Sequence, residues 1–293
     1  MSDVQLSVDS HSSPTAVPTP DTFGIGSTQG QRSAEMVAAL RAELMRNPET
    51  EALTSFRGRV MVNIMMRLVP ARHFLHFIVA RPTAFQDIIE NNIPKEKLGA
   101  KIVEIAAGLS PRGLHLARAL PNAQIIEVDL PGVVAEKQKR LHKAKINVPQ
   151  NLTWRGADLG TTPLSSVLDN EKVEVVVAEG LSQYFPPKQI QEMARYIHET
   201  LVPGGVYICD ISIEEFRILA EKQFKGAANF FSRQAGKFLG VIKDEATAKD
   251  LLLGAGYERV EYFRPSVVTK SNSAVPKPVI DLSAIFCAYK KAD

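Results

Sequence analysis

Short apolar runs alternate along the middle of the chain with segments of helical spacing. Residues 102–105 (IVEI), 124–128 (QIIEV), 173–178 (VEVVVA) and the end of 201–212 (LVPGGVYICDIS) have the composition of strands buried on both faces of a parallel sheet. Residues 188–201 instead carry apolar side chains at the spacing of a helix that packs on such a sheet. The alternation predicts an α/β fold in which helices cover a parallel sheet.

The same patterns extend toward both ends of the chain. Helices are predicted at 33–45, 56–69 and 244–253, and the last two strands at 259–263 and 280–289. We expect these two strands to form an antiparallel β-hairpin at the sheet edge. The methionine-rich helix at 56–69 suits an adaptable substrate lid, although core filling explains the methionines equally well.

The turn after the first strand has the features of a nucleotide-binding turn. It contains Gly108, and Ser110 and Pro111 suit the N-cap and first position of a helix over 111–120. The start of that helix offers free amides to an anionic ligand. Asp129 ends the next strand, at the roughly 20-residue distance from the glycine turn that is typical of an acid binding ribose hydroxyls.

The glycine pattern discriminates between cofactors. With Gly108 as the middle glycine of G-x-G-x-x-G, Ala106 and Pro111 occupy the outer positions, and a pyrophosphate needs a closer backbone approach than they allow. S-adenosylmethionine (SAM) has no phosphate and tolerates a looser turn. The pattern therefore favours SAM over NAD or FAD, and a nicotinamide-dependent oxidoreductase stays as the alternative.

Several longer motifs resemble a known family. The order of acid-ended strand, helix, L-x-P-G-G turn and strand over residues 173–212 resembles the class I SAM-dependent methyltransferases. Within them, the motifs ARPTAF (80–85), GLSPRG (108–113), EVDLPGVVAEKQKRL (127–141) and AEGLSQYFPP (178–187) resemble the leucine carboxyl methyltransferase family, whose bacterial relatives include polyketide O-methyltransferases of the tetracenomycin type. This resemblance implies a Rossmann-like seven-stranded sheet with helices on both faces and a helical N-terminal lid.

The resemblance also implies a cofactor site. Arg81 would hold the SAM carboxylate, Asp129 would bind the ribose hydroxyls, and Glu179 would lie near the methionine amino group. Asp158 and Leu159 would contact the adenine. The full set is Arg81, Glu104, Ala106, Gly108, Asp129, Leu130, Asp158, Leu159 and Glu179. These residue types suit the contacts, because arginine pairs with a carboxylate through two hydrogen bonds and a carboxylate accepts hydroxyls or an ammonium.

Plainer roles remain open for three of these residues. Arg81 is also explained as a solvated helix charge, Asp158 as a turn residue and Glu179 as a cap at the end of a strand. The sequence departs from the family pattern at two positions, where Ala106 stands for a glycine and Gln183 for an apolar residue. Both departures bear on the shape of the pocket.

Methyl transfer depends mainly on alignment of the acceptor and exclusion of water. The candidates for a base or an acceptor contact are His73, His76 and Tyr184. Because none is a compelling base, we expect an acceptor that is already ionised near neutrality, namely a carboxylate or an acidic phenol. The leading hypothesis is O-methylation of a small, polyketide-like molecule, and a SAM-binding protein without turnover is a further alternative.

Composition and charge limit the partners and the cellular location that we expect for this protein. The net charge is only +3, so we expect no nucleic-acid partner. No run reaches the ~18 apolar residues of a membrane span, and no spacing of metal ligands occurs. Cys209 and Cys287 lie inside predicted strands, which favours buried, reduced thiols in a cytoplasmic enzyme.

Three segments are predicted along the chain. Residues 1–30 contain no Lys or Arg and read as a disordered leader, 31–98 as the helical lid, and 99–293 as the SAM-binding domain. Within that domain, 213–242 is expected to be an insertion on the substrate side. Its phenylalanines are candidates to line an apolar cavity, or simply belong to an amphipathic lid: Phe216, Phe224, Phe230, Phe231 and Phe238.

Overall fold

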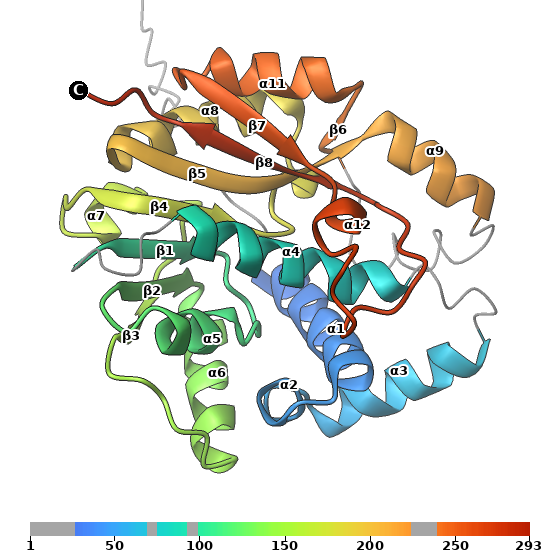
Figure 1. Cartoon of the computed structure of the whole chain (residues 1–293). Coiled ribbons are helices and arrows are strands. Elements are labelled where there is room, and N and C mark those ends of the chain that lie inside the picture. Colours follow the sequence, from blue (N-terminus) through green and yellow to red (C-terminus); the bar gives the residue numbers. More distant parts are fainter. Residues whose placement is uncertain (1–26, 69–74, 93–98, 224–238) are drawn as a thin grey trace, which may run out of the picture.

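A continuous sheet of seven strands forms the centre of the protein (Figure 1). The computed structural model describes residues 27–68, 75–92, 99–223 and 239–293. The strands are β1 (Lys101–Ile105), β2 (Gln124–Asp129), β3 (Leu152–Gly156), β4 (Val173–Ala178), β5 (Leu201–Ile213), β7 (Arg259–Phe263) and β8 (Ala284–Tyr289), in the order β3-β2-β1-β4-β5-β8-β7. Strand β8 runs antiparallel to both of its neighbours, β5 and β7, and the short β6 (Val241–Ile242) pairs with the end of β5. The predicted seven-stranded α/β sheet is confirmed.

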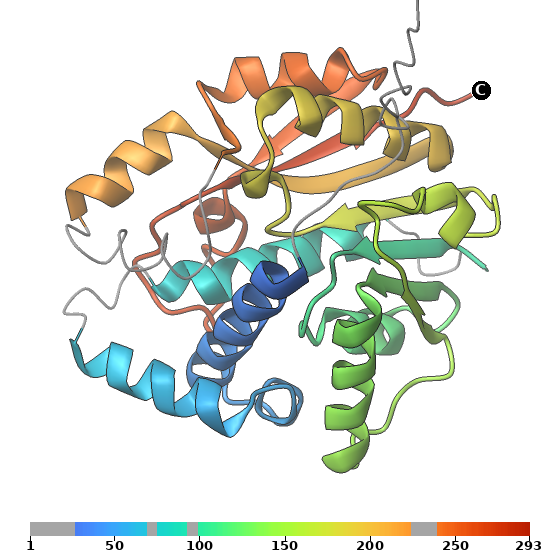
Figure 2. The ribbon, with the colours of Figure 1, turned by 180° about the vertical axis from the view of Figure 1, so that it is seen from behind.

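Helices cover both faces of the sheet. On one face lie α4 (His76–Asn92) and α5 (Arg112–Ala119), seen in front in Figure 1. On the other lie α8 (Pro187–Thr200) and α11 (Glu245–Leu253), and α8 is in front in Figure 2. Successive residues of β1 belong to opposite layers, Ile102 to the first and Val103 to the second, because strand side chains alternate. Both faces of this strand are therefore buried.

The N-terminal helices pack together beside the sheet. They are α1 (Ser27–Met45), α2 (Pro48–Ala52) and α3 (Phe56–Leu68), and their shared core includes Met36, Leu40 and Val62. Arg140 of α6 (Pro131–Lys143) connects these helices to the rest of the fold. It forms an ion pair with Glu35, and its Nη1 donates a hydrogen bond of 2.6 Å to the Leu53 carbonyl. Helix α1 begins before the predicted boundary at residue 31, and residues 1–26 lie outside the described part of the chain.

The start of α5 differs from the prediction. The helix begins at Arg112 with Pro111 as its N-cap, which makes no side-chain capping bond. Ser110 nevertheless takes up one backbone donor, because its Oγ lies 3.3 Å from the Arg112 amide nitrogen. The prediction that Ser110 is the N-cap is therefore wrong by one residue. Pro111 is the N-cap but has no side-chain acceptor, so the Ser110 hydroxyl in the preceding turn accepts the hydrogen bond instead.

The last two strands pair antiparallel at the sheet edge, as expected, but they do not form a simple hairpin. Their connection contains α12 (Pro265–Val268), and β8 starts at Ala284 rather than at residue 280. Asp281 explains the late start. Its Oδ1 accepts from the Ser266 amide at 2.8 Å, so this part of the chain is bound to α12 instead of the sheet.

A buried carboxylate joins the elements around β2. Glu127 is 1% exposed and accepts from the Gly113 amide at 3.1 Å and from Trp154 Nε1 at 2.7 Å. Its Oε2 also lies 2.6 Å from the buried Lys137 ammonium. The contacts connect α5, β3 and α6, and they place the Glu127 carboxylate directly over the α-carbon of Gly113, where no side chain fits.

We expect Gly113→Ala to destabilise the protein by about 2–4 kcal/mol, because the added methyl overlaps a buried, paired carboxylate. A Cβ at this position lies 2.2 Å from Glu127 Oε1. Urea unfolding measures the loss. Gly99→Ala is the comparison, since it has φ +71° but meets no atom within 4 Å and should lose only ~1 kcal/mol of backbone energy. Equal losses in the two variants would contradict this account.

Candidate active site

A cavity of about 170 Å³ lies at the carboxyl ends of β1, β2 and β4, the usual ligand position in an open α/β sheet. All nine residues predicted for the cofactor line it: Arg81, Glu104, Ala106, Gly108, Asp129, Leu130, Asp158, Leu159 and Glu179. Tyr184 and Gln183 line it as well, and α1 closes it with Ala34, Val37, Ala38 and Arg41. The structure thus brings the predicted residues together and adds a wall from the N-terminal helices.

The turn after β1 is held by Asp129. The Asp129 Oδ2 accepts from the Gly108 amide at 2.6 Å, and its Oδ1 accepts from the Leu130 amide at 2.7 Å. Burial raises the pKa of Asp129, and the two amide donors oppose that shift. Both Ala106 and Gly108 have positive φ, 52° and 56°. A glycine takes this conformation freely, whereas Ala106 adopts it at a cost of about 1–2 kcal/mol.

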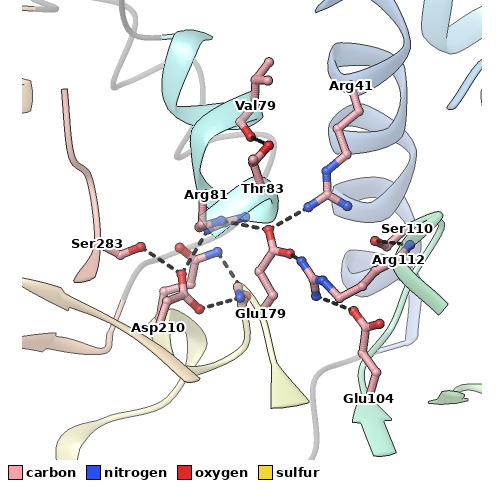
Figure 3. Close-up of polar contacts among 12 residues, drawn as sticks. Arg41, Val79, Arg81, Thr83, Glu104, Ser110, Arg112, Glu179, Asp210 and Ser283 are labelled. Carbon is pink, nitrogen blue, oxygen red and sulfur yellow. Dashed lines mark hydrogen bonds and ion pairs between the residues drawn. The ribbon is translucent and has the colours of Figure 1, made fainter. Parts of the chain in front are cut away.

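Three arginines converge on Glu179, which directly follows β4 (Figure 3). Arg41 Nη2 and Arg81 Nε lie 2.6 Å and 2.9 Å from Glu179 Oε1. Arg112 bonds to the other oxygen, Oε2. The Glu179 side chain is only 5% exposed, so these contacts are formed out of water.

Two further carboxylates complete the cluster. Arg112 Nη1 lies 2.6 Å from Glu104 Oε1, and Arg81 Nη1 lies 3.0 Å from Asp210 Oδ2. Asp210 also accepts from the Ser283 hydroxyl at 2.9 Å and from the Gly180 amide at 2.6 Å. Three guanidinium groups thus face three carboxylates, and the cluster is formally neutral.

Burial shifts several pKa values in this cluster, which we call the arginine–carboxylate cluster. Burial, together with the neighbouring Arg81, lowers the pKa of Arg41 to about 10, so Arg41 stays charged near neutrality. Burial raises the pKa of Glu104, and Arg112 opposes the rise. Among the described residues, three buried atoms here have no hydrogen-bond partner: Arg41 Nε, Arg112 Nε and Glu104 Oε2.

The other predicted residues have plainer surroundings. Asp158 is exposed and shapes a turn, because its Oδ1 accepts from the Gly160 amide at 2.8 Å. His76 lies away from the cavity, with Nδ1 2.7 Å from the Pro278 carbonyl oxygen. His73 lies outside the described residues, as do all the candidate phenylalanines of the insertion except Phe216. Phe216 is 2% exposed and belongs to the core rather than to the cavity, which corrects its predicted role.

Three residues of the cluster were not predicted. The sequence did contain an indication for Arg112. A basic side chain in the first turn of a helix interacts unfavourably with the helix dipole, which suggests that it is there to make another contact. Asp210 had an indication too, as an acid inside the apolar run of β5. Arg41 had none, since it lies in an ordinary helical segment and gains its partners only when α1 folds onto the sheet.

Solved structures with a similar fold include a possible exported protein from Bordetella parapertussis, with a TM-score of 0.56 and 16% identity over 92% of this chain and 100% of that one. An O-methyltransferase family protein from Burkholderia thailandensis has a TM-score of 0.51 and 13% identity over 86% and 67%. The SAM-dependent methyltransferase SibL in its apo form has a TM-score of 0.50 and 15% identity. The match to SibL covers 77% of this chain and only 60% of SibL. These likenesses show the fold.

The class of protein follows from the sequence rather than from these folds. The family model described as leucine carboxyl methyltransferase matches residues 32–198, more than half of the chain. The chain belongs to the leucine carboxyl methyltransferase family, and its cofactor is SAM. The nicotinamide alternative is therefore set aside. A comparison with curated protein sequences found no match, and no helix among the described residues is long and apolar enough to cross a membrane.

We expect Arg112→Met to destabilise the protein by about 3–5 kcal/mol, because it leaves the buried carboxylate of Glu104 without its arginine and removes the partner of Glu179 Oε2, although Arg41 and Arg81 still bond to Glu179 Oε1. Urea unfolding measures the change. Arg118→Met, on the same helix, is the control: its side chain is 41% exposed and pairs with Glu49, so it should lose less than ~1 kcal/mol.

The loss in the free energy of unfolding of Arg112→Met should also depend on pH. Without Arg112, the largest effect that opposes burial is gone, so the pKa of Glu104 rises further above the value in the unfolded chain. Protonation then favours the folded state, and this stability is lost as the pH rises through the folded pKa. The difference from the wild type should be smaller near about pH 5 than near about pH 8. A difference independent of pH would show that Glu104 does not titrate in the variant.

Proposed function

We propose that this protein transfers the methyl group of SAM to an oxygen of a small acceptor, a carboxylate or an acidic phenol. The supporting observation is the lining of the cavity: among the described residues it contains no histidine, lysine or cysteine. Its buried carboxylates are engaged by arginines or by backbone amides. A site without a free base favours an acceptor that is already ionised.

The arginine–carboxylate cluster suits the amino-acid end of SAM. Arg81 and Arg41 would hold the cofactor carboxylate; both line the cavity, and Arg41 Nε is a buried donor without a partner among the described residues. The family resemblance assigns the amino group to Glu179. We extend this assignment to Glu104, because its Oε2 is the buried carboxylate oxygen that lacks a partner. The ammonium and carboxylate of the amino-acid end of SAM together add no net charge to the neutral cluster, and each would face a group of the opposite charge.

The ribose and adenine belong at the opposite end of the cavity in this proposal. The Asp129 carboxylate lines the cavity there, beside the apolar side chains of Leu130, Val133 and Leu159. A carboxylate accepts hydrogen bonds from two vicinal hydroxyls, and the apolar side chains suit the faces of an aromatic base. The turn at Gly108 lacks the outer glycines that a pyrophosphate requires, and it would approach only the uncharged nucleoside part of SAM.

The protein contributes position and exclusion of water. When bound, SAM supplies an electrophilic methyl group on a sulfonium. Helix α1 closes the cavity over the cofactor end, and the half-buried Tyr184 and the buried Leu181 and Phe185 form a largely apolar wall after β4. Such a wall desolvates an ionised acceptor oxygen and restricts its approach, and alignment of this kind accounts for much of the rate in displacement reactions.

The acceptor class is tested with SAM carrying an isotopically labelled methyl group. The purified protein is incubated with matched aromatic carboxylic acids, phenols, amines and thiols, and products are identified by mass spectrometry. We expect methylated oxygen only. Mild alkali then distinguishes a methyl ester, which releases methanol, from a methyl ether, which does not. Methylation of amines or thiols alone would overturn the proposal.

The pH dependence gives a second readout of the same assay. If the enzyme supplies no base, kcat/KM for a phenol should follow ionisation of the phenol itself. Changing the phenol for a more acidic one should therefore move the profile by the same amount. A profile fixed at one pH for all phenols would instead report a base on the enzyme.

Asp129→Ala should weaken SAM binding by about 1–3 kcal/mol, the scale of hydrogen bonds to a charged group. Isothermal calorimetry measures the affinity, and circular dichroism checks that the variant is folded. Asp129→Asn keeps one acceptor oxygen and should lose less. Asp169→Ala is the control, because Asp169 is 72% exposed and pairs with Arg155 outside the cavity. Unchanged affinity in folded Asp129→Ala would remove this residue from the site.

A further inference from the structure

The loop after β4 places an amide side chain in the cavity wall. Gln183 is half-buried and lines the cavity four residues after Glu179 and next to Tyr184. Its neighbours in the wall, Leu181, Tyr184 and Phe185, are largely apolar, so the amide is a polar group within an apolar stretch of the cavity.

The orientation of the Gln183 amide follows from its one hydrogen bond. Its Nε2 lies 3.2 Å from the Gly180 carbonyl oxygen, and a carbonyl can only accept, so the nitrogen must be the atom that faces Gly180. The Oε1 atom is therefore on the other side of the amide. Within the described part of the chain no group donates to it, so among these residues Oε1 is an acceptor without a partner in a cavity-lining side chain.

The backbone around Gln183 is fixed from two sides. The Gln183 carbonyl oxygen accepts from the amides of Leu239 and Gly240 at 2.9 Å and 3.0 Å. Gly240 packs so closely that a Cβ there would lie 2.1 Å from the Ser182 carbonyl oxygen. On the other side, Asp210 holds the Gly180 amide. The position of the side-chain amide is thus set by the fold.

We infer that Gln183 determines acceptor specificity by accepting a hydrogen bond from a hydroxyl group beside the oxygen that is methylated. This inference rests on the proposed function. The reacting oxygen is ionised and has no proton to donate, so Oε1 would repel it. The group that satisfies Oε1 must be a second, protonated one on the same acceptor. A vicinal hydroxyl is the simplest such group, as in a catechol-like arene that has lost one proton.

The test measures binding independently of turnover. The protein is saturated with S-adenosylhomocysteine, and the affinities of a vicinal naphthalenediol and of the corresponding naphthol are compared by calorimetry. The wild type should prefer the diol by about tenfold, because only the diol brings a second hydroxyl that can donate to Oε1. Gln183→Leu should abolish this preference through weaker binding of the diol, while the affinity for the cofactor product stays the same.

Gln191 offers a matched control. It is also half-buried and its Nε2 also donates to a backbone carbonyl at 3.2 Å, that of Leu251, but it lies outside the cavity. Gln191→Leu should keep the tenfold preference. If Gln183→Leu unfolds at a lower temperature, Gln183→Met replaces it, since methionine has the same unbranched shape without the amide.

The two possible failures are distinguishable. A wild-type protein that prefers the diol but methylates no oxygen acceptor would contradict the proposed function and support the role of Gln183 in binding. Methylation of oxygen combined with an equal preference in wild type and Gln183→Leu would overturn the inference and leave the proposed function standing. Absence of diol binding to the wild-type complex would overturn the inference as well.

Discussion

The contact between Glu179 and three arginines determines how the cavity is built. The idealised cost of taking ions out of water is large, and it is offset only where each charge finds a close, hydrogen-bonded partner. Here Arg41 comes from α1, Arg81 from α4 and Arg112 from α5, so three helices must dock correctly for one carboxylate to be satisfied. Glu104 and Asp210 extend the same requirement to β1 and β5. The cluster therefore acts as a geometric constraint on the fold more than as a source of stability.

This constraint links the N-terminal helices to the cavity. Arg41 reaches Glu179 only when α1 lies across the cavity, and Arg140 pairs with Glu35 on the same helix. Docking of α1 and pairing of the Glu179 carboxylate therefore depend on each other. The three guanidinium groups balance the three carboxylates, so the cluster adds no formal net charge to the cavity wall.

The turn after β1 shows a local conflict resolved by its surroundings. Ala106 has φ 52°, which an alanine adopts only at some cost. Asp129 fixes the same turn through the Gly108 amide, and the sheet fixes Asp129. The surrounding contacts therefore impose on alanine the conformation that a glycine would take freely, and the turn keeps its shape.

The sequence by itself determined the α/β class, because strand and helix periodicity is a local property, and the spacing from Gly108 to Asp129 indicated the nucleotide-binding turn. The seven-stranded sheet and the rest of the cavity-lining set from Arg81 to Glu179 came from motifs that resemble the family. The start of α5 and of β8 depended on bonds made by Ser110 and Asp281, which residue preferences only partly encode. The role of Arg41 was decided by tertiary structure alone, and for Asp210 the sequence showed only an acid in an apolar strand. Their oppositely charged partners are more than a hundred residues away along the chain, and only packing of the helices on the sheet brings those charges into contact.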